Sequence, residues 1–305
     1  LSLYPVELWA RTWVERYAIT RGPAHLFSHR VSDSAENTET CRVYAFPARF
    51  SDGFPSLNRL HDTSMHQDPS ISVVLPCFNE AGSIGPLLEE FRAVLSPMAM
   101  PFEIIVVDDG STDDSVARLD ALARTMPQLL VLRHSRNLGQ SAALLSGYAH
   151  ARGEVVVTMD ADGQNDPADM PAMFALLEDA DAVCGIRKGR RDSGLKRFSS
   201  RVANAVRARV LGDGIHDAGC TFRAIRRNCL VQLPAFRGLH RFLPTILRIH
   251  GFRVVEMPVN HRARTSGESK YGVGNRLWVG IADMMAMRWY RGRHIPTDRL
   301  SKESR

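Results

Sequence analysis

Between residues 70 and 160, short apolar runs alternate with longer segments in which apolar residues recur at helical spacing. The apolar runs lack the polar alternation of a half-buried strand, so they predict strands covered on both faces. Strands are expected at 71–76, 102–109, 129–134 and 154–160, and helices at 84–95, 110–125 and 139–151. This order predicts an α/β fold whose mostly parallel sheet has helices on both faces.

The pattern is less regular on either side of this region. After about residue 184 we expect helices at 199–212 and 238–251, a strand within 252–262 and an amphipathic helix from Leu277 to Tyr290. Residues 1–66 are polar and turn-rich without a sustained period, which predicts a disordered extension. Met65 stands just before the first expected strand, so we expect a chain beginning there to fold.

Polar and charged residues follow three of the expected strands. They form the segments Pro76–Glu80, Asp108–Asp109 and Asp160–Asp162. In open parallel sheets, ligands bind at the carboxyl ends of the strands. We therefore expect the three segments to meet at one ligand-binding edge.

The last of these segments has the pattern of a metal site. Side chains at alternate positions of an extended segment lie on one face, so Asp160, Asp162 and Gln164 can converge. Carboxylates that close repel one another unless a cation lies between them. Hard oxygen ligands of this kind suit Mg²⁺ or Mn²⁺.

A surface turn is the alternative for this segment, with Asp166 capping a helix that opens at Pro167. We expect that cap in either case. An EF-hand calcium loop is excluded by its spacing. With Asp160 at position one, position six is Asn165 instead of glycine, and position twelve is Pro171 instead of glutamate.

Charge and composition narrow the classes of function. The formal net charge of the 305 residues is +6, and basic residues dominate 187–209 and 262–293. Phe198 is the one aromatic residue in the first of these clusters, which disfavours single-stranded nucleic acid as a partner. The odd count of five cysteines, without metal-binding spacing, indicates a reducing compartment. The apolar runs fall short of the roughly 18 residues that indicate a transmembrane helix.

Four ordered motifs together resemble a known family. They are VVLPCFNEAGSI, IIVVDDGSTDDS, RNLGQSAALLSGYAHARG and VVVTMDADGQNDP. They look like the nucleotide-sugar-binding half of family 2 inverting glycosyltransferases of the GT-A fold, and the likeness covers residues 69–290. The segments DAGCTFRAIRR, GLHRFLP and HRARTSGESKY are most similar to dolichol-phosphate mannosyltransferase and the bacterial polyprenyl-phosphate glycosyltransferases. The resemblance implies a catalytic domain at 67–260 and an acceptor-side segment with a polar tail at 261–305.

The resemblance assigns roles at the donor side. It implies that Pro76, Phe78 and Glu80 line the nucleotide, although Pro76 and Phe78 can also be explained as strand-end packing. It implies that Asp108 and Asp109 reach the base and ribose. Asp160, Asp162 and Gln164 match the site for the divalent ion and the diphosphate, with Asp162 catalytic. Phe78 and Gln140 stand where the family commonly has tyrosine and lysine.

At the acceptor side the resemblance implies a phosphate site and two further catalytic residues, Arg187 and Asp217. The residues matched to the phosphate site are Arg187, Lys196, Arg197, Ser200, Arg264 and Lys270. Asp217 matches an aspartate beside the sugar, and it could equally organise the turn before Gly219.

The implied reaction moves a sugar from a GDP- or UDP-linked donor to dolichyl or undecaprenyl phosphate. A phosphate monoester is largely ionised at neutral pH, so its attack needs no general base. The alternative is transfer to a hydroxyl of a glycan or lipid, which needs a base, and Asp217 is the candidate for it. A nucleotide-sugar sensor without activity is disfavoured by the intact residues Asp160, Asp162 and Gln164.

The last expected helix offers a contact with the lipid. Apolar residues recur there at helical spacing: Leu277, Trp278, Ile281, Met284, Met285 and Trp289. Such a stripe fits a helix lying on an anionic membrane surface, and it fits a helix packed on the core equally well. The resemblance favours the membrane. We therefore expect a peripheral protein on the cytoplasmic face, and a separate membrane protein is a compatible partner.

Overall fold

The computed structural model describes residues 68–188, 206–263 and 276–295. The chain divides into two units, Leu1–Thr40 and Cys41–Arg305, and every described residue lies in the second.

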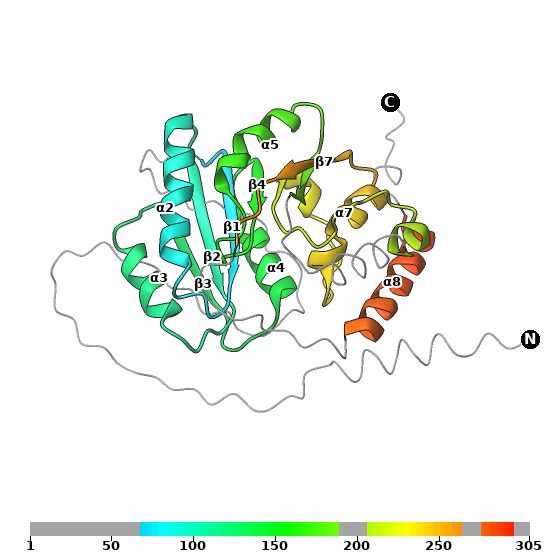
Figure 1. The fold of residues 1–305 in the computed structure, drawn as a ribbon, viewed down its shortest axis with the longest axis horizontal. Helices are drawn as coiled ribbons and strands as arrows, with labels where there is room; N and C mark the ends of the chain where they lie inside the picture. Colours follow the sequence, from blue (N-terminus) through cyan, green and yellow to red (C-terminus); the bar gives the residue numbers. More distant parts are fainter. Residues whose placement is uncertain (1–67, 189–205, 264–275, 296–305) are drawn as a thin grey trace, which may run out of the picture. The chain divides into compact units, whose positions relative to one another are not determined.

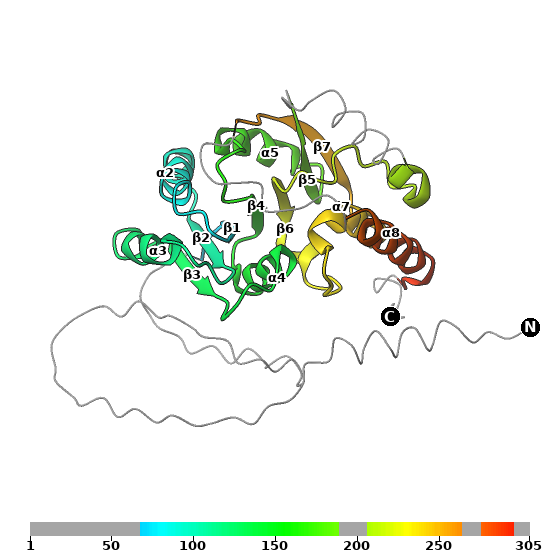
Figure 2. The same cartoon turned by 60° about the horizontal axis from the view of Figure 1, so that its bottom comes forward.

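Seven strands form one sheet in the order β3-β2-β1-β4-β6-β5-β7 within the described residues (Figures 1 and 2). The strands are β1 Ile71–Cys77, β2 Phe102–Asp108, β3 Leu129–Arg133, β4 Val155–Thr158, β5 Ala182–Arg187, β6 Arg223–Arg226 and β7 Val254–Val259. β6 pairs antiparallel with β4 and β5, and the other pairs are parallel. The predicted mostly parallel sheet is therefore confirmed, with β5 and β6 as strands that the sequence pattern did not predict.

The helices are α2 Ile84–Leu95, α3 Ser115–Ala123, α4 Gln140–His150, α5 Met170–Leu176, α7 Leu239–Ile249 and α8 Arg276–Arg293. Residues 206–211 are also helical. Short 3-10 turns occupy Ser96–Met98, Pro167–Asp169 and Arg227–Leu230. Asp166 caps the second of these turns, as predicted, because its Oδ1 accepts a hydrogen bond from the Ala168 backbone N–H at 3.0 Å.

Alternate residues of the central strands face two separate cores. Val73 and Ile104 pack in a cluster with side chains of α2, α3 and α5, whereas Val74 and Ile105 pack in a cluster with α4 and α7. These four residues are fully buried because helices cover both sides of the sheet. The predicted helices on both faces are confirmed.

Gly147 sets how closely α4 approaches the sheet. A Cβ added at this position would lie 2.3 Å from Val74 Cγ1 and 3.4 Å from Val107 Cγ2. Only a residue without a side chain allows this spacing between the helix and strands β1 and β2.

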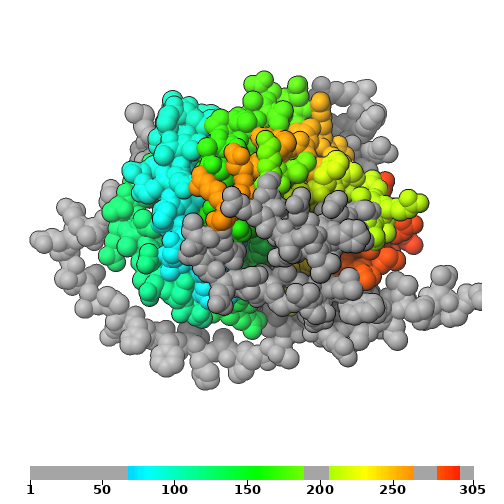
Figure 3. All heavy atoms as spheres, viewed as in Figure 1, coloured from blue at the N-terminus to red at the C-terminus, as the bar shows by residue number. Residues whose placement is uncertain are grey.

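The C-terminal helix α8 packs beside α7, and its apolar residues lie on two faces. Met287, only 4% exposed, belongs to a cluster with Leu239, Phe242 and Ile246 of α7, and Met284 packs against that cluster. Figure 3 shows α8 atoms (orange and red) at the surface beside atoms of 206–211, where Arg288 Nη1 donates to the Val210 carbonyl at 3.2 Å.

The opposite face of α8 exposes Ile281, Met285 and Trp289, at 38%, 55% and 60%. The predicted amphipathic helix is present, and within the predicted apolar stripe Met284 packs against the α7 cluster while Ile281, Met285 and Trp289 are exposed. The side chains of Leu277 and Trp278 lie outside the described residues. None of the helices in the described part of the chain combines the length and apolar character that a membrane crossing requires.

Candidate active site

The loops after β1 and β2 are bonded to each other at the carboxyl edge of the sheet. Asn79, with a φ of 54°, accepts a hydrogen bond through Oδ1 from the Thr112 backbone N–H at 2.7 Å. The backbone N–H groups of Asn79 and Glu80 donate to Ser111 Oγ at 2.9 Å and to Ser115 Oγ at 2.8 Å. The FNE and GSTDDS motifs therefore fix each other, a role that the sequence analysis did not assign.

Glu80 is linked to the loop after β4 through one hydroxyl group. Ser83 Oγ lies 3.0 Å from Glu80 Oε2 and 2.8 Å from the Ala161 carbonyl oxygen. Pro76 lies in β1 and Phe78 directly follows it, both half-buried at this edge. The three residues predicted to line a nucleotide are thus brought to the same edge as Asp160–Asp162, and their contact with a nucleotide stays a prediction.

The two aspartates at the end of β2 are in different environments. Asp108 accepts from the Ser111 backbone N–H at 3.2 Å through Oδ2, while its buried Oδ1 has no hydrogen-bond partner among the described residues. An unpaired buried acceptor is costly, and an N–H group of a ligand is the kind of partner that it lacks.

Both oxygens of Asp109, in contrast, have hydrogen-bond partners within the protein. Its Oδ1 bonds to His134 Nδ1 at 2.7 Å and accepts from the Leu138 N–H at 2.9 Å, and its Oδ2 accepts from the Gly139 N–H at 2.7 Å. His134 Nε2 in turn bonds to Ser146 Oγ at 2.9 Å. Asp109 therefore holds the loop that begins α4, and its predicted contact with base or ribose stays a prediction.

The loop after β4 brings Asp160 and Asp162 together. Gly163 has a φ of 71°, and this left-handed turn lets the Gln164 N–H donate to Asp162 Oδ1 at 3.1 Å. The Gln164 carbonyl accepts from the Arg262 N–H at 2.6 Å, which ties the loop to the end of β7. Burial, and then repulsion from Asp162, raises the pKa of Asp160 to about 6.

This loop fits a divalent cation. Two neighbouring carboxylates, one with a raised pKa, and the amide oxygen of Gln164 are the hard ligands that Mg²⁺ or Mn²⁺ takes. Within the described residues there is no group of three or more histidine, cysteine, aspartate or glutamate residues that could hold a metal. A cation held here would have to complete its shell with ligand or water oxygens, as Mg²⁺ commonly does with substrate phosphates.

Gln140, the residue that departs from the family's lysine, contacts the same loop. Its Nε2 donates to Asp160 Oδ1 at 2.5 Å. Because Gln140 opens α4, this bond links the start of that helix to the carboxylate pair. A neutral amide orients Asp160 without neutralising its charge.

Arg187 and Asp217, which were predicted to be catalytic, bind each other. Arg187 Nε donates to Asp217 Oδ2 at 2.8 Å and Nη2 donates to Oδ1 at 2.7 Å. Burial disfavours the guanidinium charge, but the hydrogen bonds and the attraction to Asp217 outweigh this and raise the pKa of Arg187. Glu256 holds the other side of the turn, since its carboxylate accepts from the His216 N–H at 3.0 Å and the Asp217 N–H at 3.3 Å.

The other residues predicted to bind an acceptor phosphate, namely Lys196, Arg197, Ser200, Arg264 and Lys270, lie outside the described residues. Of that set the structure describes Arg187 alone, at the end of β5. The contacts of the acceptor site with a phosphate therefore stay predictions.

Arg223 is a further charged residue near the site that sequence reasoning missed. It is completely buried on β6, opposite Thr158 of β4. Its Nη2 donates to the Ala218 carbonyl at 3.2 Å, while Nε and Nη1 have no hydrogen-bond partner among the described residues. In the sequence it belongs to the motif DAGCTFRAIRR, and the short strand there has two arginines in four residues and therefore no clear period.

A family model of glycosyl transferase family 2 matches residues 72–233, which include the Asp108, Asp160 and Asp217 segments. The chain belongs to this family. The prediction made from the motifs is thereby confirmed at the level of the family.

Curated relatives share about a third of their residues with the chain. Dodecaprenyl-phosphate galacturonate synthase of Rhizobium johnstonii is 36% identical over 230 residues, which are 73% of this chain and 68% of that protein. Undecaprenyl-phosphate 4-deoxy-4-formamido-L-arabinose transferase of Edwardsiella ictaluri is 36% identical over 205 residues, which are 67% of this chain and 63% of that protein. The chain thus spans slightly more than two thirds of the length of the first relative and slightly less than two thirds of the second.

Solved structures of glucosyl-3-phosphoglycerate synthase from Mycobacterium tuberculosis have a similar fold. The complex with phosphoglyceric acid gives a TM-score of 0.54 at 23% identity, covering 73% of this chain and 80% of that one. A complex of the same enzyme with Mn²⁺, UDP and glucosyl-3-phosphoglycerate gives a TM-score of 0.53 at 23% identity and the same coverage. At this identity the likeness concerns the fold, and it agrees with the predicted GT-A architecture.

Proposed function

We propose that this protein is an inverting glycosyltransferase that moves a sugar from a nucleoside diphosphate to a polyprenyl phosphate. The observation that carries the proposal is the bidentate ion pair between Arg187 and Asp217. An aspartate whose two oxygens both accept from a guanidinium is a poor general base, because that contact stabilises its ionised form. Asp217 was the candidate base for a hydroxyl acceptor, so its engagement favours an acceptor that needs none.

A phosphate monoester is such an acceptor. Its second pKa is near 6, so at neutral pH it attacks as an anion. Arg187 lies at the end of β5, and the basic residues Lys196, Arg197, Arg264 and Lys270 belong to segments outside the described residues. We propose that these residues and Ser200 bind the phosphate, with Asp217 orienting the Arg187 guanidinium.

The donor is proposed to bind along the edge formed by the loops after β1, β2 and β4. Pro76, Phe78 and Glu80 would line the nucleoside, and Asp108 would bond to it through the unpaired Oδ1. Asp160, Asp162 and Gln164 would hold Mg²⁺ or Mn²⁺. When bound, the ion would supply positive charge to the diphosphate that leaves. The neighbours' complexes with Mn²⁺ and UDP support both assignments.

The proposed step is a single displacement. A phosphate oxygen of the acceptor attacks the anomeric carbon and forms the new C–O bond. The bond from that carbon to the nucleoside diphosphate breaks, and the diphosphate leaves with the electron pair. One displacement inverts the configuration, and no proton has to move in it.

The lipid tail of the acceptor brings the protein to a membrane surface. The exposed face of α8, defined by Ile281, Met285 and Trp289, supplies apolar contact, and Arg288 and Arg293 are exposed on the same helix. An aromatic and arginine-bearing helix of this kind suits an anionic interface. We propose that the protein binds peripherally at the cytoplasmic face.

The names of the relatives support a polyprenyl-phosphate acceptor but leave the sugar open. One names galacturonate, an acidic sugar, and the other a neutral formamido-arabinose.

The test compares acceptors with and without a phosphate group. Radiolabelled UDP- and GDP-sugars are incubated with undecaprenyl phosphate, dolichyl phosphate or undecaprenol, in Mn²⁺. We expect labelled lipid with a phosphate acceptor and none with the alcohol. Transfer to undecaprenol or to a glycan hydroxyl, with none to the phosphates, would establish the hydroxyl-acceptor alternative instead.

A further inference from the structure

The backbone that follows β7 pairs with the loop that follows β4. This loop, residues 160–166, carries the three proposed metal ligands, and we call it the metal loop. Asn165 and His261 form an isolated antiparallel bridge, and the Arg262 N–H donates to the Gln164 carbonyl at 2.6 Å. The chain after β7 therefore lies directly against the metal loop.

The side chain of Arg262 joins the metal loop to helix α2. Its Nη2 lies 2.8 Å from Asp166 Oδ1, and its Nη1 donates to Glu90 Oε1 at 3.0 Å and to Oε2 at 2.8 Å. Glu90 belongs to α2, whereas Asp166 ends the metal loop. One planar guanidinium reaches both carboxylates at once, which the single ammonium group of a lysine does not reproduce.

Asn260 fixes the same backbone beside the metal loop. Its N–H donates to Asp169 Oδ2 at 2.6 Å, and its Nδ2 donates to Asp169 Oδ1 at 2.9 Å. Asp169 belongs to the 3-10 turn Pro167–Asp169, which follows the metal loop. The backbone that carries Arg262 is therefore held in place independently of the Arg262 side chain.

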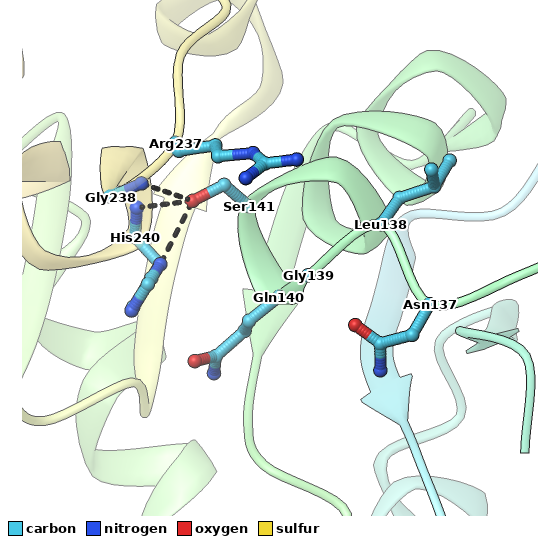
Figure 4. A pocket seen from close by; sticks show the side chains of 8 residues that line it. All are labelled: Asn137, Leu138, Gly139, Gln140, Ser141, Arg237, Gly238 and His240. Atoms are coloured by element: carbon cyan, nitrogen blue, oxygen red, sulfur yellow. Dashed lines mark hydrogen bonds between the residues drawn. The ribbon is translucent and has the colours of Figure 1, made fainter. Parts of the chain in front are cut away.

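The first half of the metal loop is held from a different element. Gln140, which lines a cavity of about 280 Å³ between the first turns of α4 and α7 (Figure 4), donates through Nε2 to Asp160 Oδ1 at 2.5 Å. Figure 4 shows the neighbouring Ser141 bonded to Gly238 and His240 instead. The metal loop thus has one support at each end.

We propose that Arg262 is a positioning residue for the divalent ion. By holding Asp166 against α2, its side chain keeps Gln164 in place beside Asp160 and Asp162. The inference rests on the proposed function, which assigns the ion to those three side chains. Mutating an outer partner of metal ligands typically lowers metal affinity or activity by roughly 10–100-fold.

The charge of Arg262 and its position predict opposite changes in metal affinity. Arg262→Gln removes a positive charge from the neighbourhood of the cation, so the change of charge alone would tighten Mn²⁺ binding. The lost link between α2 and the metal loop would weaken it. Arg262→Lys keeps the charge but loses the planar fork, so charge alone predicts wild-type affinity, whereas positioning predicts a loss.

The test measures the Mn²⁺ affinity of the full chain by EPR detection of free Mn²⁺, without donor or acceptor. Arg262→Gln should weaken Mn²⁺ binding roughly tenfold, and Arg262→Lys should show part of that loss. Glu90→Gln should act in the same direction, and the double variant should bind no more weakly than Arg262→Gln, because Glu90 acts through Arg262. Glu89→Gln and Arg92→Gln, which break an exposed ion pair on the same helix, should leave the affinity unchanged.

Thermal melts separate this effect from a loss of the fold. The side chain of Arg262 is 41% exposed, and ion pairs that exposed contribute little to stability. The melting temperatures should therefore stay close to that of the wild type. If Arg262→Gln nevertheless lost its cooperative melt, Arg262→Lys and Glu90→Gln would decide in the same way.

The inference fails if Arg262→Gln binds Mn²⁺ as tightly as the wild type or more tightly, if Arg262→Lys matches the wild type, or if the wild type binds no Mn²⁺. Transfer to undecaprenyl phosphate is measured separately. Labelled lipid from a wild type whose Mn²⁺ affinity does not depend on Arg262 would refute this inference alone. Weaker Mn²⁺ binding in Arg262→Gln, without labelled lipid from the wild type, would refute the proposed function alone.

Discussion

The proposed donor edge and the proposed acceptor side hold their carboxylates in different ways. At the proposed donor edge, Asp108, Asp109 and Asp160 accept hydrogen bonds from backbone N–H groups and an amide, and Asp109 also pairs with an imidazole. At the proposed acceptor side, Asp217 is bound by the Arg187 guanidinium.

The difference indicates what each region can receive. Carboxylates bonded to backbone N–H groups and an amide keep their charge, so the donor edge attracts a cation. The Arg187–Asp217 pair is close to neutral overall, but it holds the guanidinium in one orientation, so the proposed acceptor side offers an oriented hydrogen-bond donor to an anion. Variants of both regions can test whether this contrast governs the reaction.

The largest effect is expected at Asp162. Asp162→Asn retains an Oδ1 that can accept from the Gln164 N–H, so the melting temperature should stay close to that of the wild type. It removes one of two carboxylates proposed to hold the cation, and turnover should fall roughly 10²–10³-fold, the range seen when one electrostatic contact to a transition state is lost. Turnover and thermal melts are measured in parallel, with the exposed Asp179→Asn as the control. Wild-type turnover in excess chelator would contradict the assignment.

Arg187→Ala should act on the acceptor. Losing one partner of a partly buried charge pair typically costs 2–5 kcal/mol, so kcat/KM for polyprenyl phosphate should fall roughly 100-fold. The affinity for the nucleotide sugar should change less than about twofold, because Arg187 is at the acceptor side. Initial rates at varied polyprenyl phosphate give kcat/KM, and titration with the nucleotide sugar gives the donor affinity. A drop in donor affinity with unchanged acceptor kinetics would reverse the assignment.

Asp217→Asn is the matched variant for that pair. It keeps the Arg187 guanidinium but weakens the contact that orients it. We therefore expect kcat/KM for polyprenyl phosphate to fall about tenfold, with an unchanged pH–rate profile. If Asp217 were a general base, the loss would instead be roughly 10²–10⁴-fold.

The third effect concerns pH and stability in the absence of metal. Because the pKa of Asp160 is raised from 3.8 to about 6, the folded protein binds its proton more tightly than the unfolded chain does. This contribution to stability is present below about pH 4 and is lost as the pH rises through about 6, and it amounts to at most about 3 kcal/mol. Urea unfolding at pH 4.5 and 6.5 measures it. Asp160→Asn should show a smaller decline than the wild type, and equal declines would show that Asp160 is not responsible.

The smallest effect is expected on the exposed face of α8. Trp289→Ser should change the free energy of unfolding by less than about 0.5 kcal/mol, because the side chain is mostly exposed. Flotation with anionic liposomes should nevertheless decrease several-fold and weaken with salt. Val231→Ser, at another exposed apolar position, is the control. Equal flotation of both variants would remove α8 from the proposed membrane contact.

The two regions also differ in how far the sequence predicts them. Strands β1, β2, β3 and β4 are apolar runs followed by turn residues, so their pattern alone places Asp108 and Asp160 at one edge. β6 has only four residues and carries Arg223 and Arg226, whose side chains obscure any period. Its antiparallel pairing with β4 depends on contacts far apart in the sequence, which periodicity does not report.

The same limit applies to the side chains of the site. The spacing of Asp160 and Asp162 predicts their convergence, because it is a local property of an extended chain. The hydrogen bonds of Asp109 to the loop before α4, and of Ser141 to His240, depend instead on tertiary packing between separate elements. The motifs RNLGQS and GLHRFLP contain Ser141 and His240, but the sequence does not indicate that the two residues are in contact.

Gly147 is remote from the reacting groups, but a substitution there should be as damaging to activity as one in the site itself. Gln140 is seven residues earlier on α4, almost two full turns and so on nearly the same face. A methyl group at Gly147 would have to push the helix away from Val74. That displacement would carry the Gln140 amide away from Asp160 and would open the seam between Ser141 and His240. In a screen of random variants, Gly147→Ala should therefore appear among the inactive clones, although no reacting atom lies near it.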